Sequence, residues 1–388
     1  RTPGPAGRRS VSARRVAIDA LIAIDQGARA NVVVPDLLAK SGLDSRDRNL
    51  VTELAYGTCR MQRACDWLTQ RYARGRIEPE VRAGLRAGAY QIGWTRIPAH
   101  AAVSATVEEI RGRGRSVVNA VLRRVAADVE RGVVVWPDLA TELSYPDWIV
   151  DRLVRDLGAE PAHLALRTMN EPATVATRSD GYIQDPASQM VAAHLSRLQP
   201  DRALDVCAAP GGKATGLAGP GTGLVVAADL SAARAAVLAA NAARLGANQV
   251  ATVVADGQTP PFRPGRFDLV LVDAPCSGLG VLRRRPDARW RIQPDDVDRL
   301  AALQRRLLDA ARPLVKPGGV LAYSVCTLTA AETAAVDNWL ARAAPELTPR
   351  PPPGSPWQPA GRGALLLPQD ADTDGMFMLT LQTPPAAA

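Results

Sequence analysis

The chain has 388 residues, of which 47% are hydrophobic, and carries a formal net charge of +8. This length is enough for two or more domains with apolar cores, and no apolar run reaches the roughly eighteen residues that a membrane-spanning helix needs. Five cysteines without a Cys-x-x-Cys pair and three scattered histidines argue against disulfides, a metal site and histidine catalysis. We therefore expect a cytoplasmic monomer with reduced thiols and with neither a metal nor a membrane as partner.

The positive charge is concentrated in the N-terminal third. Residues 1–131 contain 23 Arg and Lys against 13 Asp and Glu, whereas the remainder contains 24 against 26. A basic module joined to a nearly neutral one indicates a polyanion-binding domain attached to an enzyme, although a basic solvated surface would look the same. Residues 1–11 have no apolar segment, so we expect a disordered basic arm rather than a secretory signal.

Residues 12–135 are expected to form a helical domain, because apolar residues recur there at helical spacing. The stripes are Ala17, Leu21 and Ile24; Leu85, Ala89 and Ile92; Val103, Val107 and Ile110; and Val118, Val121, Leu122 and Val125. The run from Val133 to Pro137 interrupts this pattern and marks the edge of the domain. Residues 136–182 then form a connector, with a helix predicted over 148–157.

From residue 183 to 388, strands and helices alternate, which predicts a doubly wound, Rossmann-like α/β domain. Helices are expected at 231–245, at 297–315 and from Thr329, where Thr329-x-x-Glu332 has the form of a capping box. A proline-rich loop is expected at 349–353. The predicted strands are 203–207, 224–229, 250–254, 267–273, 320–325 and 376–382.

A loop of small residues follows the first of these strands. Glycines at this place let a ligand approach the backbone at a helix N-terminus. A phosphate-binding P-loop is excluded, since Cys207 and Ala214 stand where its glycine and hydroxyl residue belong, and a dinucleotide Gly-x-Gly-x-x-Gly motif is absent. The cofactor loop consists of Cys207, Ala208, Ala209, Pro210, Gly211, Gly212 and Lys213.

Two carboxylates extend this candidate cofactor site. Asp229 ends the second strand, where it could accept hydrogen bonds from ribose hydroxyls, and Asp256 follows the third strand, within reach of an adenine edge. No Arg or Lys directly follows Asp229 to hold a ribose phosphate. Either carboxylate alone could be a solvated strand end, but together with the loop they predict a nucleoside ligand without phosphates, of which S-adenosylmethionine is the obvious candidate.

Two cysteines follow adjacent strands: Cys276 within Asp-Ala-Pro-Cys-Ser-Gly, and Cys326 within Ser-Val-Cys-Thr. A lone cysteine is usually an inert buried side chain, but ligands in such sheets bind beyond the carboxyl ends of the strands, so both thiols should face one pocket. A nitrogen methyltransferase usually has an aromatic residue where Cys276 stands. The arrangement instead fits methylation of pyrimidine carbon 5, which first needs a nucleophile such as a thiolate to add to carbon 6.

The same pattern suggests how the site would work. A helix starting at Thr329 would favour the Cys326 thiolate through its positive end. Asp273 could hydrogen-bond the ring nitrogen of cytosine and stabilise the charge that develops during attack. A base must then remove the proton from carbon 5 before the thiol is eliminated, and two thiols can divide this work.

The motifs resemble those of the RNA 5-methylcytosine methyltransferases of the RsmB (Sun/Fmu) family. The cofactor loop, the Asp-Ala-Pro-Cys-Ser-Gly turn and the Ser-x-Cys-Thr strand end carry the resemblance. Gln184-Asp185-Pro186-Ala187-Ser188-Gln189 and Asp374-Gly375-Met376-Phe377 are similar to further family motifs. The N-terminal helices, with Val118-Asn119-Ala120-Val121-Leu122-Arg123, resemble the RNA-binding fold of the antitermination factor NusB.

This resemblance covers nearly the whole chain and implies roles for individual residues. Cys326 matches the family's nucleophile, and Cys276 matches the cysteine that assists product release. S-adenosylmethionine would be held by the cofactor loop together with Asp229, Asp256 and Asp273. The implied substrate is a cytosine of small-subunit ribosomal RNA.

Two departures from the family pattern concern RNA contacts. The family usually has a longer segment between Arg178 and Gly181, which completes a small RNA-contacting subdomain. Arg285 stands where relatives commonly have His. The basic loop around it is predicted to bind phosphates and stack on bases, although a merely exposed loop would have the same composition. The loop residues are Arg283, Arg284, Arg285, Arg289 and Trp290.

Alternative functions remain open on the sequence. A transfer RNA cytosine-5 methyltransferase of the same superfamily would share all the motifs. A DNA cytosine methyltransferase would use the fourth-strand cysteine and carry a Glu-Asn-Val motif, which is not found. A non-catalytic RNA-binding protein built on the helical domain would have no use for the two cysteines.

Overall fold

The computed structural model describes residues 11–73 and 75–386, so all of the predicted basic arm except Val11 lies outside the described residues. The chain forms two compact units. The helical unit runs up to Val150 and also includes the segment Arg284–Arg291, and the α/β unit comprises Asp151–Arg283 and Ile292–Ala388. The domain limits predicted at residues 135 and 182 stay predictions. None of the described helices is both long and apolar enough to span a bilayer.

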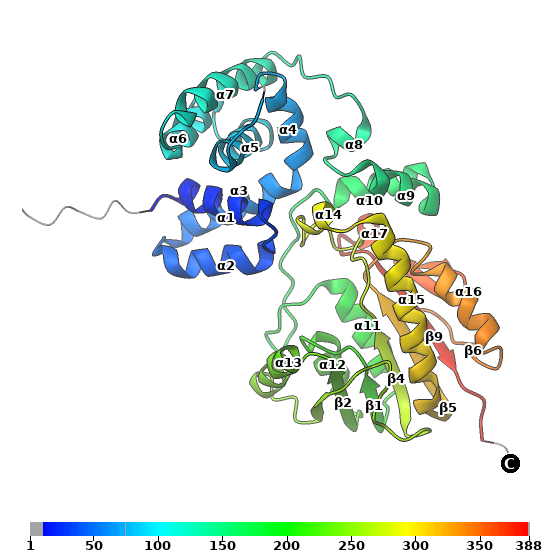
Figure 1. The fold of residues 1–388 in the computed structure, drawn as a ribbon. Coiled ribbons are helices and arrows are strands. Elements are labelled where there is room, and N and C mark those ends of the chain that lie inside the picture. Colours follow the sequence, from blue (N-terminus) through cyan, green and yellow to red (C-terminus); the bar gives the residue numbers. More distant parts are fainter. Residues whose placement is uncertain (1–10, 74, 387–388) are drawn as a thin grey trace, which may run out of the picture. The chain divides into compact units, whose positions relative to one another are not determined.

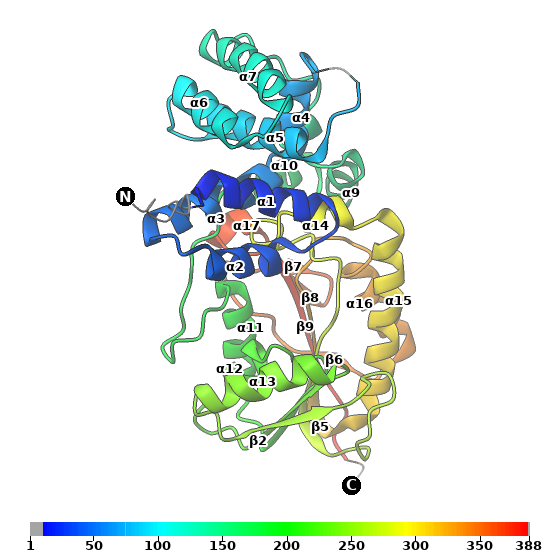
Figure 2. The ribbon, with the colours of Figure 1, turned by 60° about the vertical axis from the view of Figure 1, so that its left-hand side comes forward.

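The helical unit consists of helices that pack on one another (Figures 1 and 2). The predicted apolar stripes of these helices form a common core. Ala17, Leu85, Val103 and Leu122 are all buried there, which confirms the helical periodicity read from the sequence. The helices are α1 (Ala13–Asp25), α2 (Ala30–Ser41), α3 (Ser45–Arg60), α4 (Gln62–Gln70), α5 (Pro79–Trp94), α6 (Ala99–Glu109), α7 (Gly114–Glu130), α8 (Leu139–Glu142) and α14 (Ala288–Arg291).

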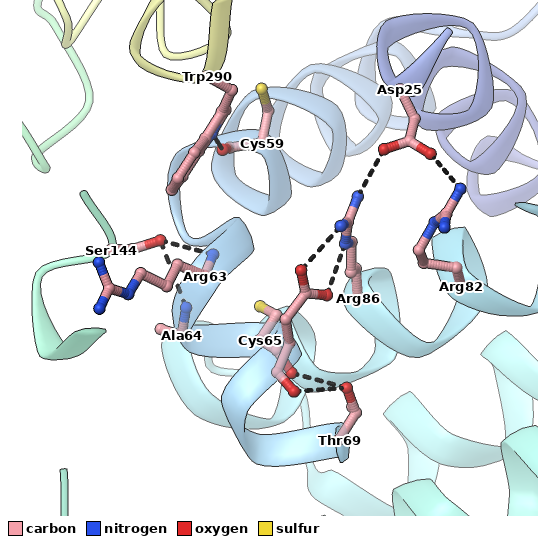
Figure 3. Close-up of polar contacts among 11 residues, drawn as sticks. Asp25, Cys59, Arg63, Ala64, Cys65, Thr69, Arg82, Arg86, Ser144 and Trp290 are labelled. Atoms are coloured by element: carbon pink, nitrogen blue, oxygen red, sulfur yellow. Dashed lines mark hydrogen bonds and ion pairs between the residues drawn. The ribbon is translucent and has the colours of Figure 1, made fainter. Parts of the chain in front are cut away.

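Ion pairs and capping bonds fasten these helices to one another (Figure 3). The guanidinium of Arg86 on α5 reaches both carboxylate oxygens of Asp66 at 2.7 Å and also contacts Asp25 of α1 at 3.1 Å. The Ser144 hydroxyl accepts a hydrogen bond of 2.9 Å from the amide of Arg63 at the start of α4. A partly buried bidentate pair of this kind fixes the register between helices, because its geometry is directional.

A single sheet of nine strands organises the α/β unit, in the order β3-β2-β1-β4-β5-β9-β8-β7, with β6 pairing β9. The first five strands in this order are parallel, and β9 is antiparallel to β5. The strands are β1 (Arg202–Asp205), β2 (Leu224–Asp229), β3 (Val250–Val254), β4 (Phe267–Asp273), β5 (Val315–Val325), β6 (Thr348–Pro349), β7 (Gln358–Ala360), β8 (Gly363–Leu366) and β9 (Met376–Gln382).

Helices cover both faces of the parallel part of the sheet (Figures 1 and 2). One face packs on α11 (Pro186–Ser196), α12 (Gly212–Leu217) and α13 (Ala232–Arg244), and the other packs on α15 (Pro294–Ala311) and α16 (Ala334–Ala343). The remaining helices are α9 (Asp147–Leu157), α10 (Ala159–Thr168) and α17 (Pro368–Ala371). The strand order reverses between β1 and β4, and ligands of doubly wound sheets bind at such a switch point. The predicted fold class is confirmed.

Some predicted boundaries differ from the structure. Helix α15 begins at Pro294, three residues before the predicted start, because Gln293 and Asp296 form a reciprocal capping box. It ends at Ala311, a 3₁₀ turn follows, and β5 already begins at Val315. The proline-rich stretch predicted as a loop contributes β6, and the short strands β7 and β8 were not predicted. These three strands are two to four residues long, too short for a recognisable alternating pattern.

Candidate active site

The cofactor loop connects β1 to α12. Gly211 is the N-cap of α12 and has a φ of +106°, a conformation that favours glycine. Gly212 faces the segment before α11, where a Cβ atom would lie 2.9 Å from Gln184 Nε2 and 3.1 Å from Tyr182 Cε1. The loop thus needs both glycines to pass close to its neighbours, and it presents the start of α12 at the switch point.

The two predicted ribose and adenine carboxylates follow β2 and β3. Asp229 is buried and accepts hydrogen bonds from the amides of Ala209 at 3.2 Å and Ser231 at 3.0 Å. Half-buried Asp256 accepts one from the amide of Gln258 at 2.9 Å. The structure also places the guanidinium of Arg234, from α13, 3.5 Å from Asp229. This cation was not predicted, because Arg234 lies in the first turn of α13 rather than directly after the strand.

A third carboxyl group, Asp205, lies at the end of β1 and was not predicted. It is fully buried, and neither of its oxygens has a hydrogen-bond partner of ordinary geometry in the described part of the chain. Burial, together with the nearby charge of Asp273, raises its pKa to about 8, and the opposing attraction of Lys213 does not cancel this shift. Such an uncompensated acid beneath the cofactor loop suits a ligand that carries positive charge.

The two cysteines predicted to share a pocket lie together. Cys276 follows β4, Cys326 follows β5, and their Sγ atoms are 3.3 Å apart. Both side chains are partly exposed and neither forms a disulfide. Strands β4 and β5 pair in parallel with Asp273 opposite Ser324, so the two turns leave the sheet side by side. The register of the sheet therefore determines that the thiols meet.

The electrostatic surroundings of the two thiols differ. A hydrogen bond to Cys326, burial, and the nearby charges of Cys326 and Glu332 raise the pKa of Cys276 well above its usual range. The raised pKa favours Cys276 as a thiol, and either sulfur can be the donor in the 3.3 Å contact. A third cysteine, Cys207 in the cofactor loop, has a pKa raised by burial and by Asp205, which makes it an inert thiol.

An ion pair lies beside the cysteines. Lys213, at the end of the cofactor loop, is buried and holds Asp273 at 2.8 Å, and the Ser324 hydroxyl donates to the other oxygen of Asp273 at 2.6 Å. Burial lowers the pKa of Lys213, but Asp273 and Cys326 raise it more, so the net shift is upward. Lys213 is thus a positive charge whose partners include the sulfur of Cys326.

The capping box predicted at Thr329 is wrong. Helix α16 begins at Ala334, and its N-cap, Thr333, makes no side-chain capping bond. Glu332 instead turns into the protein interior, where it is fully buried and accepts a hydrogen bond from the Thr329 hydroxyl at 2.8 Å. The positive helix end expected to favour the Cys326 thiolate is therefore absent from this place, and Lys213 supplies the positive charge there.

The predicted RNA-binding loop is largely occupied by protein contacts. Arg289 is fully buried, stacks 3.8 Å from the centroid of the Tyr145 ring and donates to the Ser144 carbonyl at 3.1 Å. The Trp290 indole donates to the Cys59 carbonyl at 2.7 Å (Figure 3). Arg283 is buried and donates to Asp372 at 2.8 Å.

This placement corrects the prediction for Arg283 and Arg289, because their buried guanidinium groups are engaged with the protein. Trp290 uses only its indole N–H and is half-buried, so stacking of its ring on a base stays a prediction. Arg284 is half-buried and Arg285 is exposed. The composition of the loop shows that it is basic, but it does not show which arginines bind protein groups and which face solvent.

Two residues of this site, Asp205 and Glu332, were missed as functional candidates. Asp205 had a signal in the sequence, since an acid interrupts the apolar run Ala203, Leu204 and Val206 of a buried strand. Glu332 was predicted to belong to a capping box, because the Thr-x-x-Glu spacing is the same for a capping box and for a buried glutamate bonded to a nearby threonine.

Family models match both parts of the chain. One described as "16S rRNA methyltransferase RsmB/F" matches residues 192–382, and the NusB family model matches residues 11–127. A crystal structure of the protein PH0851 superposes with a TM-score of 0.76 at 21% identity, covering 96% of this chain and 98% of that one. This likeness supports the fold.

Relatives of known sequence extend over almost the whole chain. Ribosomal RNA small subunit methyltransferase B of Thermus thermophilus is 35% identical, over 96% of this chain and 98% of the relative. A Mycobacterium tuberculosis protein named only as a methyltransferase is 39% identical, over 86% of this chain and 87% of its own length. The chain belongs to the ribosomal RNA small subunit methyltransferase B (RsmB) family of S-adenosylmethionine-dependent methyltransferases.

Proposed function

We propose that this methyltransferase acts on carbon 5 of a cytosine in small-subunit ribosomal RNA, with Cys326 as the covalent nucleophile and Cys276 assisting release. The observation that carries the proposal is the 3.3 Å distance between the two sulfurs, and the raised pKa of Cys276 favours it as the thiol of the pair. A methyltransferase acting on nitrogen or oxygen has no use for a thiol pair. The ribosomal substrate is proposed from the names of the relatives.

The unequal surroundings of the thiols support this division of roles. A negative sulfur at Cys326 would be stabilised by the hydrogen bond from Cys276 and by the charge of Lys213. The same negative charge at Cys276 would lie near the negative charge of Glu332, which opposes it. Cys326 is therefore the better nucleophile of the two.

The proposed reaction begins when the Cys326 thiolate forms a bond to carbon 6 and electron density moves to carbon 5 and the ring nitrogen. Lys213 and Asp273 offer a donor and an acceptor for the ring at this point. S-adenosylmethionine, when bound, supplies the methyl group that carbon 5 takes up. A base then removes the proton from carbon 5, the carbon–sulfur bond breaks, and the Cys326 thiolate is regenerated while Cys276 assists.

The methyl donor is proposed to lie across the cofactor loop. Asp229 and Asp256 retain unshared oxygen lone pairs for ribose and adenine groups, besides the bonds described above. The buried acid Asp205 holds its proton at neutral pH, because its pKa is raised to about 8, and a cationic donor beside it would favour its ionised form. Gly211, the N-cap of α12, turns the loop at the switch point, and the amides at the start of α12 are proposed to face the ligand.

The helical unit is proposed to bind RNA, as its NusB family match and its excess of positive charge suggest. A groove of about 810 Å³ lies along α6 and α7, and Arg113, Arg115 and Arg123 are among the residues that line it. Exposed arginines along a groove suit phosphates of the RNA backbone. Arg284 and Arg285 remain proposed RNA contacts, whereas the buried Arg283 and Arg289 do not.

Cysteine variants test the proposed chemistry. Cys326→Ala should abolish methyl transfer and form no covalent RNA adduct, whereas Cys276→Ala should accumulate a protein–RNA adduct that survives denaturation. Cys65→Ala, a buried cysteine of α4 in the helical unit, is the control for loss of a thiol. An adduct that appears with Cys326→Ala instead would reverse the assignment of roles.

The substrate needs a separate experiment. Bisulfite sequencing of ribosomal and transfer RNA, from cells with and without the gene, should show one cytosine of small-subunit ribosomal RNA that loses protection in the deletion strain. Loss of protection confined to transfer RNA would refute the ribosomal assignment and leave the chemistry intact.

A further inference from the structure

The carboxylate of Glu332 connects the two turns that carry the cysteines. It accepts hydrogen bonds from the Ser277 amide at 2.8 Å and the Ser277 hydroxyl at 2.5 Å, next to Cys276. It also accepts one from the Thr327 hydroxyl at 3.1 Å, next to Cys326. The hydroxyls of Ser277 and Thr327 are themselves 2.8 Å apart. One carboxylate thus holds the neighbour of each thiol.

This arrangement is a complete polar network in the protein interior. Glu332 is fully buried and receives further bonds from the Thr329 hydroxyl at 2.8 Å and from Gln304 Nε2 at 3.0 Å. Gln304, from α15, also donates to the Pro275 carbonyl at 3.0 Å. All five donors to the carboxylate are neutral groups. Burying a carboxylate is costly and needs such full satisfaction, so a purely structural site would be better served by apolar residues.

We propose that Glu332 is a positioning residue, which holds the Cys276 and Cys326 turns at the separation that lets one thiol serve the other. The proposal rests on the proposed function, in which Cys276 assists the release of Cys326 from the base. Without the carboxylate, Ser277 and Thr327 lose their common acceptor, and Cys276 is no longer held within hydrogen-bond distance of Cys326. Attack by Cys326 needs only that thiol, whereas release needs both, so release is the step that suffers most.

The negative charge of Glu332 supports this role. It is one of the causes that keep the pKa of Cys276 high, so it helps to maintain Cys276 as a thiol while Cys326 reacts. The titratable groups that act on Cys276 are Cys326 and Glu332, and Tyr323, with its hydroxyl 2.7 Å from the Glu332 carbonyl, lies behind them.

The test compares Glu332→Gln with a matched control, Asp337→Asn. Asp337 is also a buried acid, but it pairs with Arg362 at 2.7 Å and makes none of the bonds to the cysteine turns. With a transcript of small-subunit ribosomal RNA, E332Q should reduce kcat at least about tenfold, which corresponds to losing one or two charged hydrogen bonds. Its fraction of covalent adduct at steady state should rise, while its Kd for S-adenosylmethionine stays that of the wild type. D337N should keep the wild-type adduct fraction per active site.

The adduct fraction separates positioning from folding, because a variant that only folds less well lowers the number of active sites and leaves the fraction in each unchanged. An unchanged adduct fraction and kcat per active site in E332Q would overturn the proposal. If E332Q does not fold, Ser277→Ala and Thr327→Val decide in the same assay, since each removes one hydroxyl from the carboxylate. Absence of any adduct in Cys276→Ala would instead refute the proposed function.

Discussion

The buried acid Asp205 makes the stability of the protein depend on pH in a way that Asp205→Asn should remove. The folded protein holds the proton of this carboxyl up to about pH 8, whereas an unfolded chain releases it near pH ~4. Between these values unfolding releases a proton, so the free energy of unfolding falls as pH rises. Above about pH 8 both states are ionised and the dependence from this group ends.

The slope for one proton is about 1.4 kcal/mol per pH unit. Between pH 5 and pH 7 the wild-type protein should therefore lose about 3 kcal/mol relative to Asp205→Asn, whose side chain does not titrate. This difference does not depend on how well asparagine packs, because a packing cost is the same at both pH values.

The measurement is urea unfolding followed by circular dichroism at pH 5, 6, 7 and 9, without the methyl donor. Asp201→Asn, an exposed carboxylate four residues earlier, is the matched control and should follow the wild type. A difference between wild type and Asp205→Asn that is the same at pH 5 and pH 7 would show that the carboxyl is ionised in the folded state, against the reasoning above.

The affinity of the wild type for S-adenosylmethionine should rise from pH 6.5 to pH 8, by up to about tenfold per pH unit, because a cation beside Asp205 favours the ionised acid. Calorimetry with Asp205→Asn should show no such rise. Gly211→Ala should weaken the affinity for S-adenosylmethionine about tenfold. The left-handed backbone costs an L-residue about 1–2 kcal/mol, and the Cβ of the alanine would lie 3.2 Å from Leu238 Cγ. Unchanged binding would mean that the loop adapts. Arg289→Ala should lower the free energy of unfolding of the helical unit by about 3 kcal/mol, because stacking on Tyr145 is lost and carbonyls are left unpaired. The exposed Arg285→Ala should change it by no more than about 0.5 kcal/mol. Equal melting temperatures for the two variants would contradict this prediction.

Patterns of several residues predicted the fold well. The six strands 203–207 to 376–382 were recognisable as short apolar runs bounded by turns, and each occurs in the structure within a few residues. Five of them are parallel, and 376–382 is the antiparallel β9. The convergence of Cys276 and Cys326 followed from the rule that strand ends of a doubly wound sheet share one edge. This part of the site needed only topology.

The features that the sequence could not reveal depend on where a side chain turns. Glu332 fits a capping box by spacing, but only the packing of α15 and two strand ends decides that it points inward. Arg289 fits an RNA-binding loop by charge, but the ring of Tyr145, distant in sequence, takes its guanidinium. Local patterns carry no information on such long-range partners.

The short segment Arg284–Arg291 belongs to the helical unit, although it lies in the middle of the sequence that forms the α/β unit. The helical unit is therefore built from two separate stretches of the chain. A fragment starting at residue 151 would carry Arg289 and Trp290 but lack the Tyr145 ring and the Cys59 carbonyl that receive them. The helical unit can therefore not be exchanged by replacing the N-terminal part of the chain alone. A transplanted helical unit would need its own returning segment, and separately expressed fragments 11–150 and 151–388 are a natural pair for complementation in trans.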